Sequence, residues 1–429
     1  MDIRYLYAIY QKSGYVSTDS RNIKPGCIFF ALKGENFNGN RFALHAIESG
    51  ASAAVVDEDP VQSHPQLFKV QHVLETLQEL ANYHRRQLAL TLLAITGSNG
   101  KTTTKELCKA VLAKKFTVQA TEGNLNNHIG VPLTLLSIDR HTEAGIIEMG
   151  ANHPGEIRQL CDIAEPDFGL ITNIGKAHLE GFGSLEGVSR AKGELFEHLR
   201  HRGKTIFVNE NDPFIIKQVM HGYARVHYYN GPHGLIVKQA KADPFLDLEA
   251  SEGTQSIRVS TSLLGRYNTE NVLAACCVGM KFGVPVQEIE EAIQNYKPGN
   301  NRSQFIETGK NRLFMDAYNA NPSSMQAAIS EFLQIREDKK LLILGEMREV
   351  GTSSRREHEK LIEGLTGSTL SDIICVGRSF EGMLPQTGFR YFETADKLSD
   401  YLLQNPVQGC FILIKGSRSN RLEEIVPLL

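Results

Sequence analysis

The sequence predicts an α/β protein of three domains. The chain has 429 residues, about three times the length of a typical domain. Short apolar runs alternate with helical patterns through most of it, which is typical of parallel sheets covered by helices. A composition of 41% hydrophobic and 22% charged residues is that of a globular protein and argues against a disordered chain.

Apolar runs that end in glycine or a polar residue are the expected strands. They are residues 90–96, 145–149, 169–174, 204–208, 341–344, 372–376 and 411–415. Residues 235–261 instead alternate, which predicts antiparallel strands in a small insertion or flap. Sites in open α/β sheets lie beyond the carboxyl ends of strands. The residues that follow these runs are therefore the first functional candidates.

Two breaks in the pattern suggest the domain boundaries. A helical stretch ends at residues 84–87 (HRRQ), just before the strongest strand. Residues 296–301 (YKPGNN) combine a Pro-Gly pair with two asparagines between a helix and the next strand. We expect domains at residues 1–85, 86–301 and 302–429.

Charge and cysteine usage exclude several classes of function. The net charge of −3 provides no global field that would attract nucleic acid or an anionic membrane. No run approaches the ~18 apolar residues of a spanning helix, and the N-terminus lacks a signal segment. Seven cysteines without a CxxC pair predict reduced, mostly buried thiols. We expect a cytoplasmic monomer with neither membrane nor nucleic acid as a partner.

A candidate phosphate-binding loop follows the strand at 90–96. Its residues are Gly97, Ser98, Asn99, Gly100, Lys101, Thr102 and Thr103, and a helical pattern over 105–114 comes next. Backbone N–H groups of such a loop surround phosphate oxygens, the lysine reaches the β- and γ-phosphates, and the Thr102 hydroxyl can hold Mg²⁺. Ile95 stands where the strict pattern has glycine, so this is the shorter TGxxGKT form. A turn that contains Gly-Lys-Thr by chance is the less favoured interpretation.

Segments along nearly the whole chain resemble the Mur ligase superfamily. They are STDSR at 17–21, TGSNGKTT at 96–103, GNLNNHIGVPLTLL at 123–136, EMGANHPGEI at 148–157, AHLEGFGSLEGVSRAKGE at 177–194, GRYNTENVLAA at 265–275, DAYNANPSSM at 316–325, LGEMREVG at 344–351 and KGSRS at 415–419. Four of them (GNLNN, GANHPGEI, AHLEGFGS and DAYNANP) are most similar to the branch that adds D-alanyl-D-alanine to UDP-N-acetylmuramoyl-tripeptide. The resemblance implies ATP-driven amide formation through an acyl phosphate, in the synthesis of peptidoglycan precursors.

The resemblance also implies a catalytic site with two Mg²⁺ ions. Glu148 and His178 match magnesium ligands of the family, beside Thr102. Glu148 also ends an apolar strand, an awkward place for a carboxylate without a cation. Lys192 matches a lysine that reacts with CO₂ to give a carbamate ligand, and its prerequisite is a neutral amine, which burial can supply. The predicted catalytic residues are Lys101, Glu148, His178 and Lys192, and the predicted metal ligands are Thr102, Glu148, His178 and Lys192.

The resemblance assigns further residues to the nucleotide. Asn268 and Asn271 match the positions that contact adenine. Arg302 and Asp316 would reach the phosphates and ribose from the C-terminal domain, so domain closure would complete the ATP site. The family usually has Pro-Gly-Arg, whereas two extra residues precede Arg302 here.

The substrates would contact all three domains. The UDP moiety is expected in the first domain, although Asn38-Gly39-Asn40 replaces the more usual Asp-Gly-His. The muramoyl part is expected beside GNLNNHIG, which includes His128, and the dipeptide beside DAYNANP and KGSRS. The predicted substrate-binding residues are Ser20, Arg21, Lys33, Asn126, Asn127, Tyr318, Asn319, Asn321, Lys415 and Arg418. The charge run at 355–360 is interpreted as a solvated helix face.

Two other functions stay open. A sister ligase would add a diamino acid to the dipeptide precursor, but no Asp-Asn-Pro-Arg selector stands in the C-terminal domain. A nucleotide-driven switch or binding module would hydrolyse ATP without needing an amine. The third residue of the tripeptide is not determined by the sequence.

Overall fold

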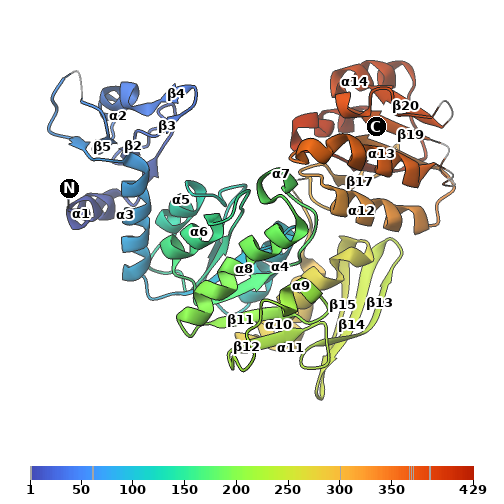
Figure 1. The fold of residues 1–429 in the computed structure, drawn as a ribbon, viewed down its shortest axis with the longest axis horizontal. Helices are drawn as coiled ribbons and strands as arrows, with labels where there is room; N and C mark the ends of the chain where they lie inside the picture. Colours follow the sequence, from blue (N-terminus) through green and yellow to red (C-terminus); the bar gives the residue numbers. More distant parts are fainter. Residues whose placement is uncertain are drawn as a thin grey trace.

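Three α/β units follow one another along the chain. The computed structural model describes residues 2–59, 62–299, 301–366, 368, 370, 372–385 and 388–429. In Figure 1 the N-terminal unit lies at one end, the unit with the central sheet in the middle and the C-terminal unit at the other end. Each unit has its own sheet, parallel or mainly parallel, so the predicted α/β class is confirmed.

A four-stranded parallel sheet of order β1-β2-β5-β6 forms the N-terminal unit. Its elements are α1 (Ile3–Ser13), β1 (Val16–Ser17), β2 (Ile28–Phe30), α2 (Ala43–Glu48), β5 (Ala53–Val56), β6 (Leu67–Lys69) and α3 (Val73–Gln87), with a hairpin of β3 (Lys33–Gly34) and β4 (Phe37–Asn38). Every residue of β2 and β5 is buried, because inner strands of a parallel sheet are covered on both faces.

The middle unit has a six-stranded parallel sheet of order β12-β11-β10-β7-β9-β8. The strands are β7 (Thr91–Thr96), β8 (Val118–Ala120), β9 (Ala144–Glu148), β10 (Phe168–Ile171), β11 (Thr205–Asn209) and β12 (Val226–Tyr229). The helices are α4 (Lys101–Leu112), α5 (Gly130–Ser137), α6 (Glu156–Ala164), α7 (Leu179–Phe182), α8 (Leu185–His201), α9 (Pro213–Ile216), α10 (Thr269–Lys281) and α11 (Val286–Asn295).

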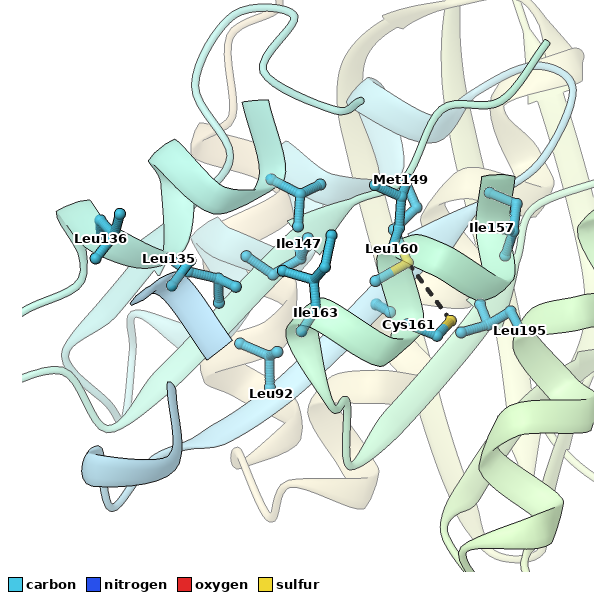
Figure 2. Packing of buried hydrophobic residues seen from close by; sticks show 14 of the residues in the cluster. Leu92, Leu135, Leu136, Ile147, Met149, Ile157, Leu160, Cys161, Ile163 and Leu195 are labelled. Carbon is cyan, nitrogen blue, oxygen red and sulfur yellow. Dashed lines mark hydrogen bonds between the residues drawn. The ribbon is translucent and has the colours of Figure 1, made fainter. Parts of the chain in front are cut away.

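Successive residues of the middle strands enter two different cores. Leu92 and Ile147 pack on the face covered by α3, α5, α6 and α8, where the sulfur atoms of Cys161 and Met149 lie 3.8 Å apart (Figure 2). Leu93, the next residue, packs on the opposite face against α4, α10 and α11. Both faces are covered, which explains why these strands are continuous apolar runs.

The predicted antiparallel strands are confirmed. They are β13 (Ile236–Ala242), β14 (Phe245–Glu252) and β15 (Gln255–Leu264), which form a three-stranded antiparallel sheet. This sheet and the turn after it contact the C-terminal unit. The Phe245 and Phe305 rings lie 5.3 Å apart, and the Arg266 backbone N–H donates to Glu331 at 3.1 Å.

The C-terminal unit has a six-stranded sheet of order β16-β17-β21-β18-β19-β20, in which only the edge strand β16 is antiparallel among the described strands. Its elements are β16 (Gln304–Glu307), β17 (Arg312–Asp316), α12 (Pro322–Gln334), β18 (Lys340–Gly345), α13 (Ser354–Leu365), β19 (Ile373–Val376), β20 (Phe389–Phe392), α14 (Ala395–Gln404) and β21 (Phe411–Lys415). The side chain of Asn321 caps helix α12, and Pro322 occupies its first position.

Most predicted strands lie within one residue of the observed bounds, and three predictions differ by more. Strand β10 ends at Ile171, three residues before the predicted end. Helix α4 begins at Lys101, four residues before the predicted start. The solvated helix face at 355–360 is wrong at His358, which is fully buried. Asn300, in the predicted break at 296–301, lies outside the described residues.

Two other expectations concern the whole chain. All seven cysteines are free, and all except Cys410 are buried, as predicted. Among the residues described, no helix is both long and apolar enough to cross a membrane.

Candidate active site

A cleft of about 1020 Å³ lies between the middle and C-terminal units. Its walls come from loops that follow β7, β9 and β10 on one side and β17, β18 and β21 on the other. The carboxyl edges of both parallel sheets therefore contribute to one cavity, as expected for sites in open α/β sheets. The predicted residues that line it are Ser98, Asn99, Gly100, Lys101, Thr102, Thr103, Asn126, Asn127, His128, Glu148, His178, Asn268, Asn271, Arg302, Asp316, Tyr318, Asn319, Asn321, Lys415 and Arg418.

The loop between β7 and α4 has the backbone geometry that glycine permits. Gly97 and Gly100 have φ values of +143° and +76°. A Cβ atom would lie 2.0 Å from Thr172 Oγ1 at Gly97 and 2.3 Å from Asn271 Oδ1 at Gly100, so a side chain fits at neither position. The N-terminus of α4 follows directly at Lys101, which directs its free N–H groups and partial positive charge to the loop.

The Lys101 side chain folds back onto this loop and contacts its backbone. Its Nζ donates to the carbonyl oxygens of Gly97 at 2.7 Å and Ser98 at 3.2 Å. Burial lowers the pKa of Lys101, with a smaller contribution from the positive charge of Arg302, while Glu148 opposes the shift. A lysine and an arginine from different units therefore approach the same loop, where the charge of a nucleotide phosphate would be favourable.

Glu148 lies at the end of β9, beside the loop. Its Oε2 accepts a hydrogen bond from Thr102 Oγ1 at 2.8 Å, and its Oε1 accepts one from Asn126 Nδ2 at 2.8 Å. The residue is only 2% exposed, and no ion pair joins it to a cationic side chain in the described part of the chain. A buried carboxylate without a counter-ion is costly, and a hydroxyl beside it fits the oxygen ligands of Mg²⁺.

The other protein ligands for such a cation are few. No three His, Cys, Asp or Glu side chains of the described residues converge as a metal site. Mg²⁺ is commonly held by one or two carboxylates together with substrate phosphates and water. Thr102 and Glu148 therefore fit a magnesium ion that a bound nucleotide helps to hold.

His178 contacts the C-terminal unit rather than Glu148. Its Nδ1 lies 2.8 Å from Glu349 Oε2, outside the geometry of a hydrogen bond, so this buried nitrogen has no hydrogen-bond partner. Both residues have a left-handed backbone, with φ values of +51° and +60°. Non-glycine residues in this region store strain that often marks functional sites. The neighbouring His178 imidazole lowers the pKa of the Glu349 carboxyl, Lys101 adds a smaller effect in the same direction, and burial opposes the shift.

Lys192 lies on α8 behind the cleft and is 1% exposed. Its Nζ donates to the Ala151 carbonyl at 3.3 Å and lies 5.3 Å from the centre of the Phe182 ring. Burial, with a smaller effect from the charge of Lys101, holds the pKa of Lys192 well below its usual range. A neutral amine is the chemical state that burial favours.

Asn268 and Asn271 form a buried pair at the start of α10. Asn271 Nδ2 donates to Asn268 Oδ1 at 2.9 Å, and Thr104 Oγ1 donates to Asn271 Oδ1 at 3.1 Å. Because Asn271 also lies against Gly100, the amides are held next to the phosphate loop. Donor and acceptor groups so placed suit a nucleobase.

Two contacts bring the C-terminal unit to the cleft. Asn321 Nδ2 donates to Asn99 Oδ1 at 2.7 Å, and Ser323 Oγ accepts from the Lys176 N–H at 3.1 Å. Inside that unit, Lys415 forms an ion pair with Asp316 at 2.5 Å. This ion pair offsets part of the negative charge that Asp316 would otherwise present to a nucleotide.

Five predicted site residues do not line the cleft. Gly97 is the first residue of the loop, Lys192 lies behind the wall, and Ser20, Arg21 and Lys33 belong to the N-terminal unit. Arg21 pairs with Asp19 at 2.8 Å, and Lys33 pairs with both Asp57 and Glu58 at 2.9 Å. Their roles stay predictions.

Some residues of the cleft were not predicted individually. Glu349 approaches His178, and Asn173 accepts a hydrogen bond from the Asn99 N–H at 3.0 Å. Glu349 lies in the segment LGEMREVG, which resembles the family as a whole without indicating one residue. Asn173 lies two residues after the end of β10, so its position near a strand end is the signal that the sequence offers.

Comparisons with known proteins agree with this architecture. Three family profiles match consecutive parts of the chain: "Mur ligase family, catalytic domain" at residues 14–88, "Mur ligase middle domain" at 95–279 and "Mur ligase, glutamate ligase domain" at 301–418. Proteins named UDP-N-acetylmuramoyl-tripeptide–D-alanyl-D-alanine ligase from Bacillus subtilis and Escherichia coli are 34% and 35% identical to the chain. The alignments cover 96% of this chain and 92% and 93% of these relatives.

Solved structures give the same result. A crystal structure of MurF from Acinetobacter baumannii has a TM-score of 0.88 and 30% identity, covering 96% of this chain and 93% of that one. MurF ligase from Thermotoga maritima, in complex with ADP, has a TM-score of 0.86 and 28% identity, covering 96% of both chains. Family profiles match all three units, two relatives exceed 30% identity, and solved structures match nearly the whole chain. The chain therefore belongs to the Mur ligase family.

Proposed function

We propose that the protein is an ATP-dependent ligase that joins D-alanyl-D-alanine to UDP-N-acetylmuramoyl-tripeptide. The observation that carries this proposal is the whole-length similarity, at 34% and 35% identity, to two proteins named for that reaction. The cleft supports it, because a phosphate loop on one side faces the DAYNANP and KGSRS segments on the other.

The reaction has two steps. The tripeptide carboxylate attacks the γ-phosphorus of ATP, the bond to the bridging oxygen breaks, and ADP leaves. The dipeptide nitrogen then attacks the acyl carbon of the acyl phosphate and loses a proton, and inorganic phosphate leaves. In both steps negative charge develops around the transferred phosphoryl group and the acyl phosphate, so catalysis depends mainly on positioned cations and hydrogen-bond donors.

The phosphate loop binds the nucleotide in this proposal. Lys101 moves its ammonium from the Gly97 and Ser98 carbonyls to the phosphates, and Arg302 adds a second cation from the C-terminal unit. Asn268 and Asn271 accept and donate hydrogen bonds at the adenine. Asp316 reaches the ribose while Lys415 shields its charge.

Two Mg²⁺ ions belong to the proposal. When bound, they neutralise phosphate charge and polarise the transferred phosphoryl group. Thr102 and Glu148 would hold one ion, and the buried, unpaired carboxylate of Glu148 supports this. His178 would hold the second ion through Nε2, while Glu349 beside Nδ1 fixes the orientation of the ring.

Lys192 would complete the second site as a carbamate. Its amine nitrogen would form a carbon–nitrogen bond with CO₂ and release a proton, which would convert a neutral group into an anion. The burial of Lys192 and the lowered pKa of its ammonium support the neutral nucleophile that this step needs.

The remaining assignments concern the two other substrates. Ser20, Arg21 and Lys33 would contact the UDP moiety, and Asn126 and Asn127 the muramoyl peptide. Tyr318, Asn319, Asn321, Lys415 and Arg418 would contact the dipeptide. Since ATP and UDP-linked precursors are cytoplasmic metabolites, the cytoplasm is the compartment in which this enzyme would work.

An amine panel tests the proposal. The protein is incubated with ATP, Mg²⁺ and UDP-N-acetylmuramoyl-tripeptide, and phosphate release is compared with D-alanyl-D-alanine, lysine, diaminopimelate and glutamate, using Lys101→Ala as the inactive control. Release with the dipeptide alone, together with a product of the pentapeptide mass, is expected. Release with a single amino acid would identify the sister ligase, and release independent of any amine would identify a switch.

A further inference from the structure

Two arginines from different segments converge on one tyrosine ring in the cleft. The guanidinium carbon of Arg302 lies 3.7 Å from the centre of the Tyr318 ring, and that of Arg418 lies 5.5 Å from it. Both distances are within the range of a cation–π interaction. All three residues line the cleft.

The strand register explains the convergence. Strand β17 pairs with β16 on one side and β21 on the other, with Gln304 opposite Met315 and Asp316 opposite Lys415. Arg302 precedes β16, Tyr318 follows β17 and Arg418 follows β21. Three neighbouring strands therefore present these side chains at the same edge of the sheet.

Neither guanidinium has a carboxylate partner among the described residues. Nearby cations do: Lys415 pairs with Asp316, and Arg348 pairs with Glu346 at 2.7 Å. Two unpaired arginines that share one aromatic ring leave their donor edges for anions from outside the protein. The effect of Arg302 on the pKa of Lys101 is consistent with a guanidinium close to the phosphate loop.

We propose that Tyr318 is a positioning residue whose ring holds Arg302 toward the nucleotide phosphates and Arg418 toward the carboxylate of the incoming dipeptide. This inference rests on the proposed function for the dipeptide, whereas the nucleotide part is independent of it. A single ring shared by both guanidiniums couples the binding of the two anionic ligands. Tyr318 then acts through its aromatic face rather than through its hydroxyl.

Replacing the ring tests the proposal. Tyr318→Leu and Tyr318→Met remove the aromatic face, and Tyr318→Phe keeps it without the hydroxyl. Tyr401→Leu is the matched control, because the Tyr401 ring on α14 has its centre 5.8 Å from the guanidinium carbon of Arg390 on β20, away from the cleft. The measurements are ADP binding by calorimetry, the KM for ATP and for D-alanyl-D-alanine, kcat, and thermal unfolding.

The aliphatic variants should weaken ADP binding and raise the dipeptide KM by about fivefold each. Tyr318→Phe should recover most of both losses, and Tyr401→Leu should show neither. In an Arg302→Ala background, Tyr318→Leu should add little to the loss of ADP affinity, because the two residues act as a unit. A folded aliphatic variant with wild-type ADP affinity would overturn the proposal, as would an equal loss in Tyr318→Phe. Absence of dipeptide-dependent turnover in the wild type would instead overturn the proposed function, while ADP binding still decides the role of Tyr318 toward Arg302.

Discussion

The side chains of Asn99 and Asn321 form a 2.7 Å hydrogen bond that joins the phosphate loop to the C-terminal unit. Asn321 has a second task, because its Oδ1 accepts from the Ser324 N–H at 2.9 Å and caps α12. One amide therefore fixes the start of a helix with its oxygen and contacts the phosphate loop with its nitrogen. The position of the C-terminal unit is coupled to the loop through this side chain.

Asn321→Ser separates these two tasks. Serine still caps a helix but is too short to reach Asn99. We expect a melting temperature close to that of the wild type and a loss of turnover of about fivefold, which corresponds to a net hydrogen bond of about 1 kcal/mol. Asn321→Ala should lose the bridge and also about 1 kcal/mol of unfolding free energy. Full activity in a folded serine variant would show that the bridge is dispensable.

A second prediction concerns the strained pair of His178 and Glu349. Carboxylates commonly orient metal-binding imidazoles, and their loss costs about 10- to 100-fold in metal affinity or activity. Glu349→Gln removes the charge and should lower turnover at least about tenfold and raise the Mg²⁺ concentration needed for half-maximal rate. Glu359→Gln, which disrupts an exposed ion pair on α13, is the control. If both variants respond alike to Mg²⁺, Glu349 does not orient the histidine.

A third prediction uses two glycines with positive φ. Gly100 and Gly203 have φ values of +76° and +62°, but only at Gly100 would a Cβ meet another atom, Asn271 Oδ1, at 2.3 Å. Each alanine variant should carry about 1–2 kcal/mol of backbone strain. Only Gly100→Ala should also weaken ADP binding, by at least about tenfold, because it displaces Asn271 from the loop. Equal ADP affinity in the two variants would contradict this reading of the loop.

The sequence predicts the bounds of an element well where a single apolar run or a single motif determines them. Strand β21 has the predicted bounds, since an apolar run between polar residues leaves no alternative. The sequence predicts the start of α4 four residues too late, because Lys101 to Thr104 belong to the phosphate-loop motif and also to the helix. At His358 the signal was available: His358, Ile362 and Leu365 are spaced by four and three residues and share the buried face of α13.

The site could be predicted from sequence only as far as motifs reach. The phosphate loop and the polar ends of β9 and β17 were found as segments, and the structure brings them to one cleft. The contacts between units could not be found, because Asn99 and Asn321 are separated by more than two hundred residues and no periodicity relates them. The pairing of His178 with Glu349 is of the same kind, since it depends on how two units are oriented.

A fourth prediction concerns Lys192. Lys192→Ala should lose most activity, and formate or acetate should restore part of it by replacing the carbamate oxygens. Lys192→Arg should stay inactive, because a guanidinium remains cationic. Wild-type protein in ¹³C-labelled bicarbonate should give a carbamate signal in its carbon NMR spectrum, and Lys192→Ala should not. Lys109→Ala is the control on another helix. Full activity of the arginine variant would exclude the carbamate.

The last prediction concerns the pH dependence of stability through His358. The contacts fix its neutral form: Nδ1 faces the Ser354 carbonyl at 2.7 Å and acts as the donor, and Nε2 accepts from the Met347 N–H at 3.0 Å. Protonation of Nε2 would remove the acceptor for Met347, in the loop that also carries Glu349. Burial lowers the pKa of His358, while the carboxylates of Glu346 and Glu357 oppose the shift.

Because the folded pKa lies below the unfolded value of about 6.5, the unfolded chain binds more protons between the two values. The free energy of unfolding should therefore decrease as the pH falls below about 6.5, by at most about 1.4 kcal/mol per pH unit for this group, and the decrease should stop at the folded pKa. His358→Gln, whose amide offers one donor and one acceptor, should reduce this slope in denaturant unfolding measured at pH 7.5, 6.5 and 5.5. His221→Gln, at an exposed imidazole, is the matched control. Identical slopes in the wild type and His358→Gln would show that His358 does not contribute to the loss of stability in acid.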